Sequence, residues 1–176
     1  MSTYEFSKDS LVSVSVASKP VLGMSHKPTF SAAPKGGTIS ATESDGRFVA
    51  NVTFSVEGDS LDPGKEHSRF DREKMRANLG GKDVLDTQHH PTIIVNCLYQ
   101  GTLEIGTLQA EIHLRGVPRN VTFAVSIRQD GDRLHAEGQW EGTLTDLGIK
   151  PFRALLGALT LKDWVRLHFC VDLAPT

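Results

Sequence analysis

Regular alternation between apolar and polar side chains is the sequence feature that most constrains how this chain folds. Every second residue from Phe48 to Val56 is apolar, whereas the residues between them are mostly polar. Because a β-strand sends successive side chains to opposite faces, Arg47–Glu57 is predicted to be a strand with one buried face. The pattern recurs, clearly or more weakly, at Leu11–Ala17, Gly37–Ala41, Pro91–Tyr99, Ile105–Leu114, Asn120–Ile127, Arg133–Thr145 and Val165–Leu173.

Short turns between these segments favour an antiparallel arrangement. Asp45-Gly46, Gln100-Gly101 and Asp130-Gly131 are glycine-bearing turns of the kind that joins hairpin strands, and residues 116–119 are predicted to form another. An open sheet of this kind leaves two unpaired edges, which closure into a barrel removes. The predicted fold class is therefore all-β, a closed eight-stranded antiparallel barrel that holds either packed side chains or one small ligand.

A helix is predicted where the alternation first breaks, after the third strand. Ser68–Leu79 is rich in helix-favouring residues, opens with the order of a capping box at Ser68 and Asp71, and is followed by two glycines. Phe70 and Leu79 are expected to hold this helix across one end of the barrel.

A second break, Gly148–Gly157, precedes the last strand. Its Pro151 suits the first turn of a helix and its final glycine suits a helix end, so the segment is predicted to be a short helical plug. Lys150 lies among apolar residues there. Two interpretations of it stay open: a cation that meets a ligand head group, or a side chain that extends to solvent.

Composition and charge narrow the possible functions. The 176 residues suit one domain, 1–176, and the net charge of -2 with interspersed signs points neither to a nucleic-acid partner nor to an anionic membrane. No stretch approaches the ~18 apolar residues of a membrane span, and the first ten residues lack the apolar segment of an export signal, so a cytoplasmic location is expected. Cys97 and Cys170 follow opposite strand faces, which predicts two free thiols.

Three motifs lie in the second half of the chain: residues 146–163, which begin Asp-Leu-Gly-Ile-Lys-Pro-Phe, residues 113–121, and residues 84–93. In order and spacing they resemble the YceI-like family. That resemblance spans Phe70–Leu173 and implies a lipocalin-like barrel associated with the binding of polyisoprenoids and related lipids. It also implies a homodimer, and many members of the family are exported to the periplasm.

The resemblance and the inward-facing pattern together predict non-enzymatic binding or transport of an apolar chain. The expected ligands are isoprenoid quinones, polyprenols, fatty acids and fatty amides, and no cofactor is expected beyond such a co-purified ligand. Small inward residues at positions 50, 136, 138 and 142 are expected to leave room between larger side chains. The predicted ligand-binding residues are Val14, Phe30, Phe48, Ala50, Val52, Phe54, Ile93, Val95, Phe123, Val125, Trp140, Lys150, Phe152 and Leu156.

Two other functions remain as alternatives. His26, His67, His89 and His90 fall in loops or at element ends, so they offer a metal-binding or catalytic site at a barrel mouth, although the HxH and HExxH spacings of zinc ligands are absent. No GxSxG nucleophile motif occurs, and no catalytic or metal-ligating residue is predicted. The other alternative is a packed barrel whose outer face binds a partner protein.

Overall fold

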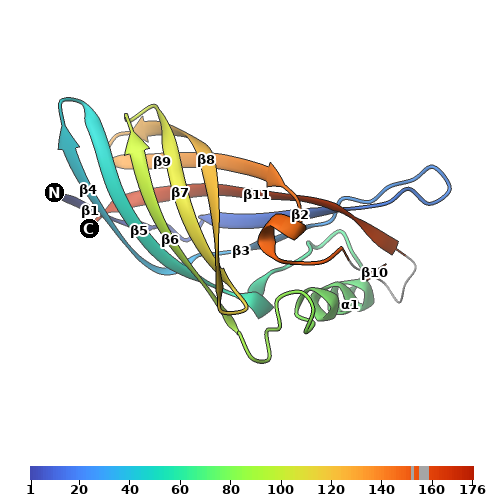
Figure 1. The fold of residues 1–176 in the computed structure, drawn as a ribbon. Coiled ribbons are helices and arrows are strands. Elements are labelled where there is room, and N and C mark those ends of the chain that lie inside the picture. The colour runs from blue at the N-terminus through green and yellow to red at the C-terminus, as the bar shows by residue number, and fades with distance from the viewer. Residues whose placement is uncertain (152, 155–158) are drawn as a thin grey trace.

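A computed structural model of the chain describes residues 1–151, 153–154 and 159–176 (Figure 1). Long antiparallel strands form a closed barrel, one α-helix of the described residues lies near one end, and both chain termini lie together near the other. The strands are β1 (Ser2–Phe6), β2 (Leu11–Ser18), β3 (Thr29–Ala32), β4 (Lys35–Ser44), β5 (Arg47–Glu57), β6 (Thr92–Gly101), β7 (Ile105–Leu114), β8 (Val117–Asp130), β9 (Arg133–Gly142), β10 (Arg153–Ala154) and β11 (Leu159–Pro175).

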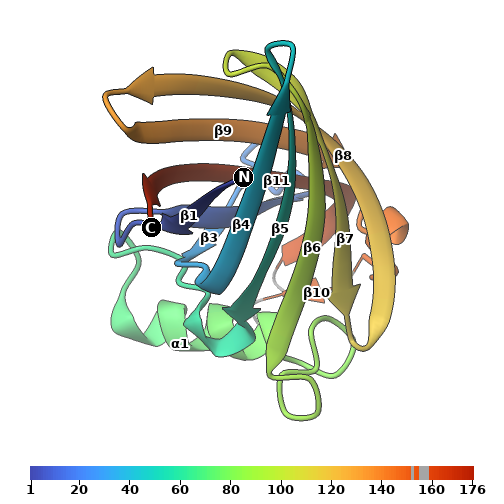
Figure 2. The same ribbon diagram turned by 90° about the vertical axis from the view of Figure 1, so that its left-hand side faces the viewer.

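The barrel closes through β11, the longest strand (Figure 2). One edge of β11 pairs with β9, and the other pairs with β2 and then with β1. Around the wall the order is β1-β4-β5-β6-β7-β8-β9-β11, and the pairing of β1 with β11 completes the circle. This confirms the predicted closed, eight-stranded antiparallel barrel. Each strand along this path has a hydrogen-bonded neighbour on both sides, although β1 pairs with only Ile39–Ala41 of β4.

Most of the predicted strands occur where the alternation places them, but the N-terminal wall is more extensive than predicted. β1 and β3 lie where no strand is predicted: β1 is only five residues long and β3 only four. Each extends the wall of the strand beside it, since β1 pairs with β4 and β3 pairs with β2. Periodicity is a weak signal over four or five residues, because so few side chains define each face.

Three of the predicted turns are shifted along the chain, among them Asp130-Gly131, since Asp130 ends β8 and Gly131-Asp132 forms the turn. The turn at Asp45-Gly46 is confirmed, with both residues at positive φ as a two-residue hairpin requires. The turn expected at residues 116–119 is instead formed by Arg115-Gly116, also at positive φ, and Val117 already belongs to β8. Gln100-Gly101 lies within β6, so the chain turns after it.

The helix α1 (Arg69–Leu79) confirms the predicted helix and its cap. The Asp71 N–H donates to the Ser68 hydroxyl oxygen at 3.1 Å, and that hydroxyl donates to the Asp71 carboxylate at 2.7 Å. Leu79 is buried as expected. The expectation for Phe70 is wrong: its ring is exposed and lies beneath the Lys74 ammonium, because it falls on the solvent side of α1.

The short helical plug is not found in the described part of its segment. Gly148–Pro151 has no regular structure, and β10 pairs with the start of β11. A single 3-10 turn, Thr145–Leu147, lies just ahead of the segment and ends at Gly148 in the left-handed conformation. Cross-strand hydrogen bonds of β10 thus replace the expected helical ones; Phe152 and residues 155–158 lie outside the described residues.

Asp62 anchors α1 to the barrel. Its carboxylate accepts hydrogen bonds from the Arg72 and Arg76 guanidinium groups at 2.8 and 2.7 Å and from the Gly64 N–H at 2.8 Å. Its backbone pairs with Ser31 of β3. These contacts connect the helix, the loop before it and the barrel wall.

Replacing Asp62 by asparagine is expected to lower the free energy of unfolding by about 1 kcal/mol at neutral pH, a modest value because the carboxylate is partly exposed. The Gly64 N–H, and then the two arginines, hold the pKa of this carboxyl below its ordinary value. The stabilisation is therefore present above the ordinary pKa and is lost as the pH falls below about 4. Urea unfolding of both proteins at several pH values measures this. Glu73→Gln, which removes an exposed pair with Arg69, is the control and should cost less than about 0.5 kcal/mol.

Candidate functional site

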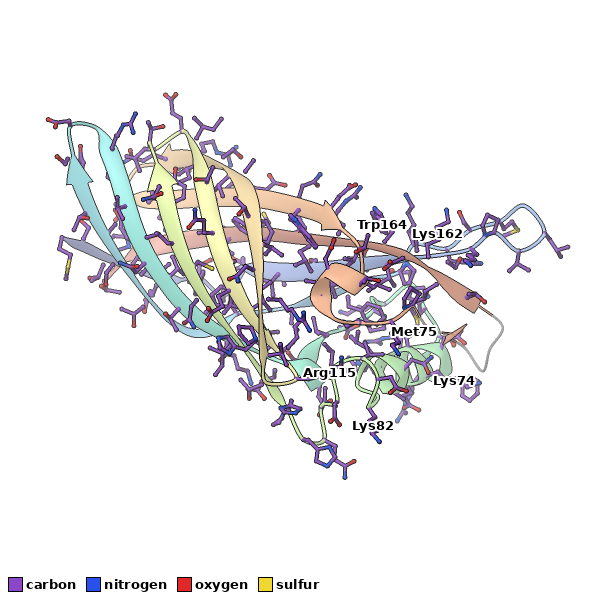
Figure 3. The ribbon with its side chains drawn as sticks, viewed as in Figure 1. Lys74, Met75, Lys82, Arg115, Lys162 and Trp164 are labelled. Carbon is purple, nitrogen blue, oxygen red and sulfur yellow. The ribbon has the colours of Figure 1, made fainter. Side chains whose placement is uncertain are left out.

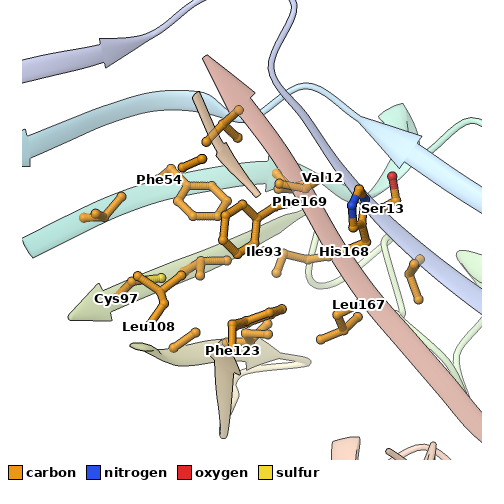
Figure 4. A pocket seen from close by; sticks show the side chains of 18 of the residues that line it. Val12, Ser13, Phe54, Ile93, Cys97, Leu108, Phe123, Leu167, His168 and Phe169 are labelled. Atoms are coloured by element: carbon orange, nitrogen blue, oxygen red, sulfur yellow. The ribbon is translucent and has the colours of Figure 1, made fainter. Parts of the chain in front are cut away.

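A cavity of about 500 Å³ runs through the barrel from the end that holds the termini to α1. Almost all of its walls are apolar side chains on the inward face of the strands. Figure 4 shows Phe54, Ile93, Leu108 and Phe123 converging on this space from four strands. The alternation that builds the wall also lines the cavity, because every second residue of each strand points inward.

Ten of the fourteen predicted ligand-binding residues line the cavity: Val14, Phe30, Phe48, Ala50, Val52, Phe54, Ile93, Val95, Phe123 and Val125. Trp140 packs against the core but is not among the lining residues, because its ring covers Gly142. Lys150 is exposed and does not line the cavity, since its ammonium group reaches water. Phe152 and Leu156 lie outside the described residues. Contact of the lining residues with a ligand stays a prediction.

Several lining residues were not predicted. α1 and the loop after it contribute Met75, Asn78, Leu79, Val84 and Leu85, which close the helix end of the cavity. Met75, Asn78 and Leu79 are spaced i, i+3 and i+4, so they share one face of the helix. This spacing is the sequence signal that could have predicted them. β1 adds Tyr4 and Phe6, and β11 adds Leu167, Phe169 and Val171. The β11 residues follow a clear alternation, which would have revealed them.

The predicted small positions create space in two different ways. Ala50 and Ala136 line the cavity directly. The two glycines instead accommodate aromatic rings: a Cβ on Gly138 would lie 2.8 Å from the Phe169 ring, and one on Gly142 would collide with Trp140. Gly138 lets Phe169 reach Phe123, with the two rings edge to face at 5.3 Å. The expectation of free space at the two glycines is therefore wrong, since aromatic rings fill it.

The interior carries little charge. Among the described lining residues only Glu43 and His168 have an acidic or basic side chain. Glu43 is exposed at the end of β4. His168, whose neighbours in sequence Leu167 and Phe169 face inward, pairs with Glu137. Burial raises the pKa of the Cys97 thiol to about 12, so Cys97 behaves as a small neutral group in the wall.

The four histidines predicted as an alternative site lie in different surroundings. His26 lies in the hairpin between β2 and β3, His67 precedes α1, His89 bonds to Asp86 at 2.9 Å, and His90 lies beside the turn at Gly116. No group of three or more His, Cys, Asp or Glu side chains able to hold a metal ion occurs within the described ranges.

A polar ladder lies on the outer face of β9 and β11. His135 Nδ1 lies 2.8 Å from an Asp172 carboxylate oxygen, and His168 Nε2 lies 2.9 Å from one of Glu137. Cys170 lies between these pairs, with its sulfur 3.8 Å from His135 Nε2. Burial and the neighbouring carboxylates raise the pKa of the Cys170 thiol, while the His168 hydrogen bond lowers that of Glu137. A protonated thiol is a poor nucleophile, so the ladder has the character of cross-strand pairs that stabilise a sheet.

The closed barrel, the apolar cavity and the helix across one end define a lipocalin-like barrel with an internal binding space. The family model of the YceI-like domain matches residues 8–173, so the chain belongs to the YceI-like family. A comparison with curated proteins finds no significant match.

Solved structures support the same fold. BcnA of Burkholderia cenocepacia aligns with a TM-score of 0.65 and 14% identity over 96% of this chain and 99% of BcnA. The YCEI protein of Campylobacter jejuni aligns with a TM-score of 0.58 and 12% identity over 81% of this chain and 82% of that protein. Within the described residues, no helix is long and apolar enough to cross a membrane.

Proposed function

We propose that the barrel binds an apolar chain ligand in its central cavity and carries it without chemical change. The observation that supports this most is a hollow interior, lined by apolar side chains, in place of a packed core. Folded proteins normally fill such space, because empty apolar volume costs stability. The YceI-like family to which the chain belongs is known for binding hydrophobic ligands.

The shape and chemistry of the walls favour a long, neutral ligand. A chain that extends from the terminal end to α1 would meet apolar side chains throughout, and each buried methylene contributes about 0.8 kcal/mol. A charged head group inside would lose hydration without an opposite charge to replace it. Asn78 offers a neutral amide where α1 faces the cavity. We therefore favour isoprenoid quinones, polyprenols and fatty amides over ionised fatty acids.

The test is to identify what the protein holds. Mass spectrometry of an organic extract of gently purified protein is expected to show a prenyl or acyl lipid at near-stoichiometric amount. Delipidated protein is then titrated with a prenyl quinone, a fatty amide of similar length and the matching fatty acid. We expect the two neutral ligands to bind more tightly than the acid at pH 8. An empty extract combined with no binding of any of the three would refute the proposal.

The homodimer stays a prediction. β6 has no edge for strand pairing between subunits, because β5 and β7 occupy both of its edges. A dimer there would have to use side chains on its outer face, such as the exposed Ile94. Sedimentation equilibrium measures the association state directly.

A further inference from the structure

A two-stranded ribbon extends beyond the barrel at its helix end. β2 and β3 are joined by residues 19–28, of which 19–27 form a hairpin that we call the arm; it projects away from the rest of the molecule (Figure 1). At its base, the Ser18 N–H donates to the His26 carbonyl at 2.8 Å. At its tip, Val21 and Met24 exchange backbone hydrogen bonds of 2.8 and 3.0 Å around a two-residue turn, Leu22-Gly23.

The tip of the arm is apolar and strained. Val21 is 47% exposed, Leu22 98% and Met24 63%. Leu22 has φ 51 and Gly23 has φ 75, the positive values of a tight hairpin turn. Asparagine or glycine suits the first of these positions, and a leucine there is sterically unfavourable. The arm thus combines backbone strain with exposed apolar surface, two costs that an Asn-Gly turn would avoid.

Basic side chains lie along the arm, and further cations lie at this end of the barrel among acidic residues such as Asp71, Glu73 and Asp83. Lys19 and Lys27 flank the apolar tip, and Lys27 lies 5.1 Å from the Trp164 ring. Figure 3 shows Lys74, Lys82, Arg115 and Lys162 at this end of the barrel.

The hairpin turns at the opposite end are mainly acidic and exposed. Arg47 and Arg133 are outnumbered there by Glu43, Asp45, Glu104, Asp130 and Asp132. The acidic turns thus lie at the end of the barrel away from the lysines of the arm.

We propose that the arm inserts its tip, Val21, Leu22 and Met24, into the surface of an anionic lipid bilayer, with Lys19 and Lys27 at the lipid head groups. Amphipathic insertion of this kind combines buried apolar side chains with attraction of basic residues to anionic lipids. A second copy fits the arm less well, because pairing two arms would bring their lysines together. The inference does not depend on the identity of the cavity ligand, and vesicle binding is measured with none added.

Leu22→Asn tests the arm without weakening the fold. Asparagine tolerates positive φ, so this variant should unfold at the same temperature as the wild type or higher. We expect the wild type to co-sediment with mixed phosphatidylcholine and phosphatidylglycerol vesicles, and Leu22→Asn to reduce the partition coefficient about tenfold. Lys27→Gln should reduce it about fivefold on these vesicles and leave binding to pure phosphatidylcholine unchanged. Ile105→Asn, a matched change of an exposed apolar residue at the acidic end, should have no effect.

Three results would overturn the proposal. The wild type fails to bind the anionic vesicles, Leu22→Asn binds them as tightly as the wild type, or Ile105→Asn weakens binding as much as Leu22→Asn. If Leu22→Asn instead dissociates a dimer of the wild type in solution while vesicle binding is unchanged, the arm contacts a second copy and the bilayer assignment is wrong.

Discussion

Replacement of Ala110 by phenylalanine is expected to weaken binding of a prenyl ligand about a hundredfold while the barrel stays folded. Ala110 is buried on β7, lines the cavity and lies opposite Cys97 and Val121 on the neighbouring strands. A phenyl ring at this position would occupy the space of three or four methylene groups of a ligand. Each methylene group that is no longer buried lowers the binding free energy by about 0.8 kcal/mol. Isothermal titration or fluorescence titration with a prenyl quinone measures the change.

Ala124 supplies the matched control for this experiment. It lies on β8, the next strand, but it is exposed and alternates with the inward-facing Phe123 and Val125. Ala124→Phe adds the same ring to the outside of the barrel and should leave the dissociation constant within about twofold of the wild type, as expected of a surface substitution. Equal binding by both variants, with the thermal transitions of both retained, would show that the ligand does not occupy the cavity.

Replacement of Gly106 by alanine is expected to lower the free energy of unfolding by about 2–3 kcal/mol. Gly106 on β7 faces Gly101 on β6, and the Tyr99 ring lies over this pair. An added Cβ would lie 2.5 Å from the ring and 2.6 Å from the Gln100 carbonyl oxygen. The ring is not free to move, because the Tyr99 hydroxyl donates to the Thr102 carbonyl at 2.5 Å. Urea unfolding followed by tryptophan fluorescence measures the loss.

Gly131→Ala separates this collision from the general cost of removing a glycine. Gly131 lies in the turn between β8 and β9, and no atom lies within 4 Å of where its Cβ would be. Its φ of 62 still disfavours alanine, so a loss of about 1 kcal/mol is expected. If Gly106→Ala lowers the free energy of unfolding no more than Gly131→Ala does, Tyr99 and the strand backbone move to accommodate the added Cβ.

Much of the barrel could be predicted because the alternation of apolar and polar residues indicates which side chains of each strand face inward. The bounds of β5 and β7 follow from it, and the capping pattern at Ser68 correctly places the start of α1. β1 was not predicted, because five residues are too few to show a clear alternation. The described part of the segment after Gly148 differs from the prediction because proline is equally compatible with the first turn of a short helix and with irregular chain, as found at Ile149–Pro151.

The cavity itself could not be predicted from alternation. Periodicity assigns Gly138 and Phe123 to the inner face, but whether space remains there depends on how side chains from opposite walls meet. Phe169, from the other end of the sequence, fills the space at Gly138, while the space beside Ala110 stays open. Lys150 illustrates a different limit, because its apolar neighbours in sequence do not determine where a long flexible side chain ends.

The way β11 closes the barrel has a consequence for how the protein folds. This strand pairs with β1 and β2, so completion of the barrel joins residues from opposite ends of the chain. Contacts so distant in sequence carry a large loop-closure entropy, and all-β proteins rich in them fold in milliseconds to seconds. Until β11 docks, β9 on one side and β1 with β2 on the other present unpaired backbone edges, which other chains can join. The species most prone to aggregation should therefore be a late intermediate with the last strand undocked, and short peptides copied from β11 should inhibit refolding by occupying its place.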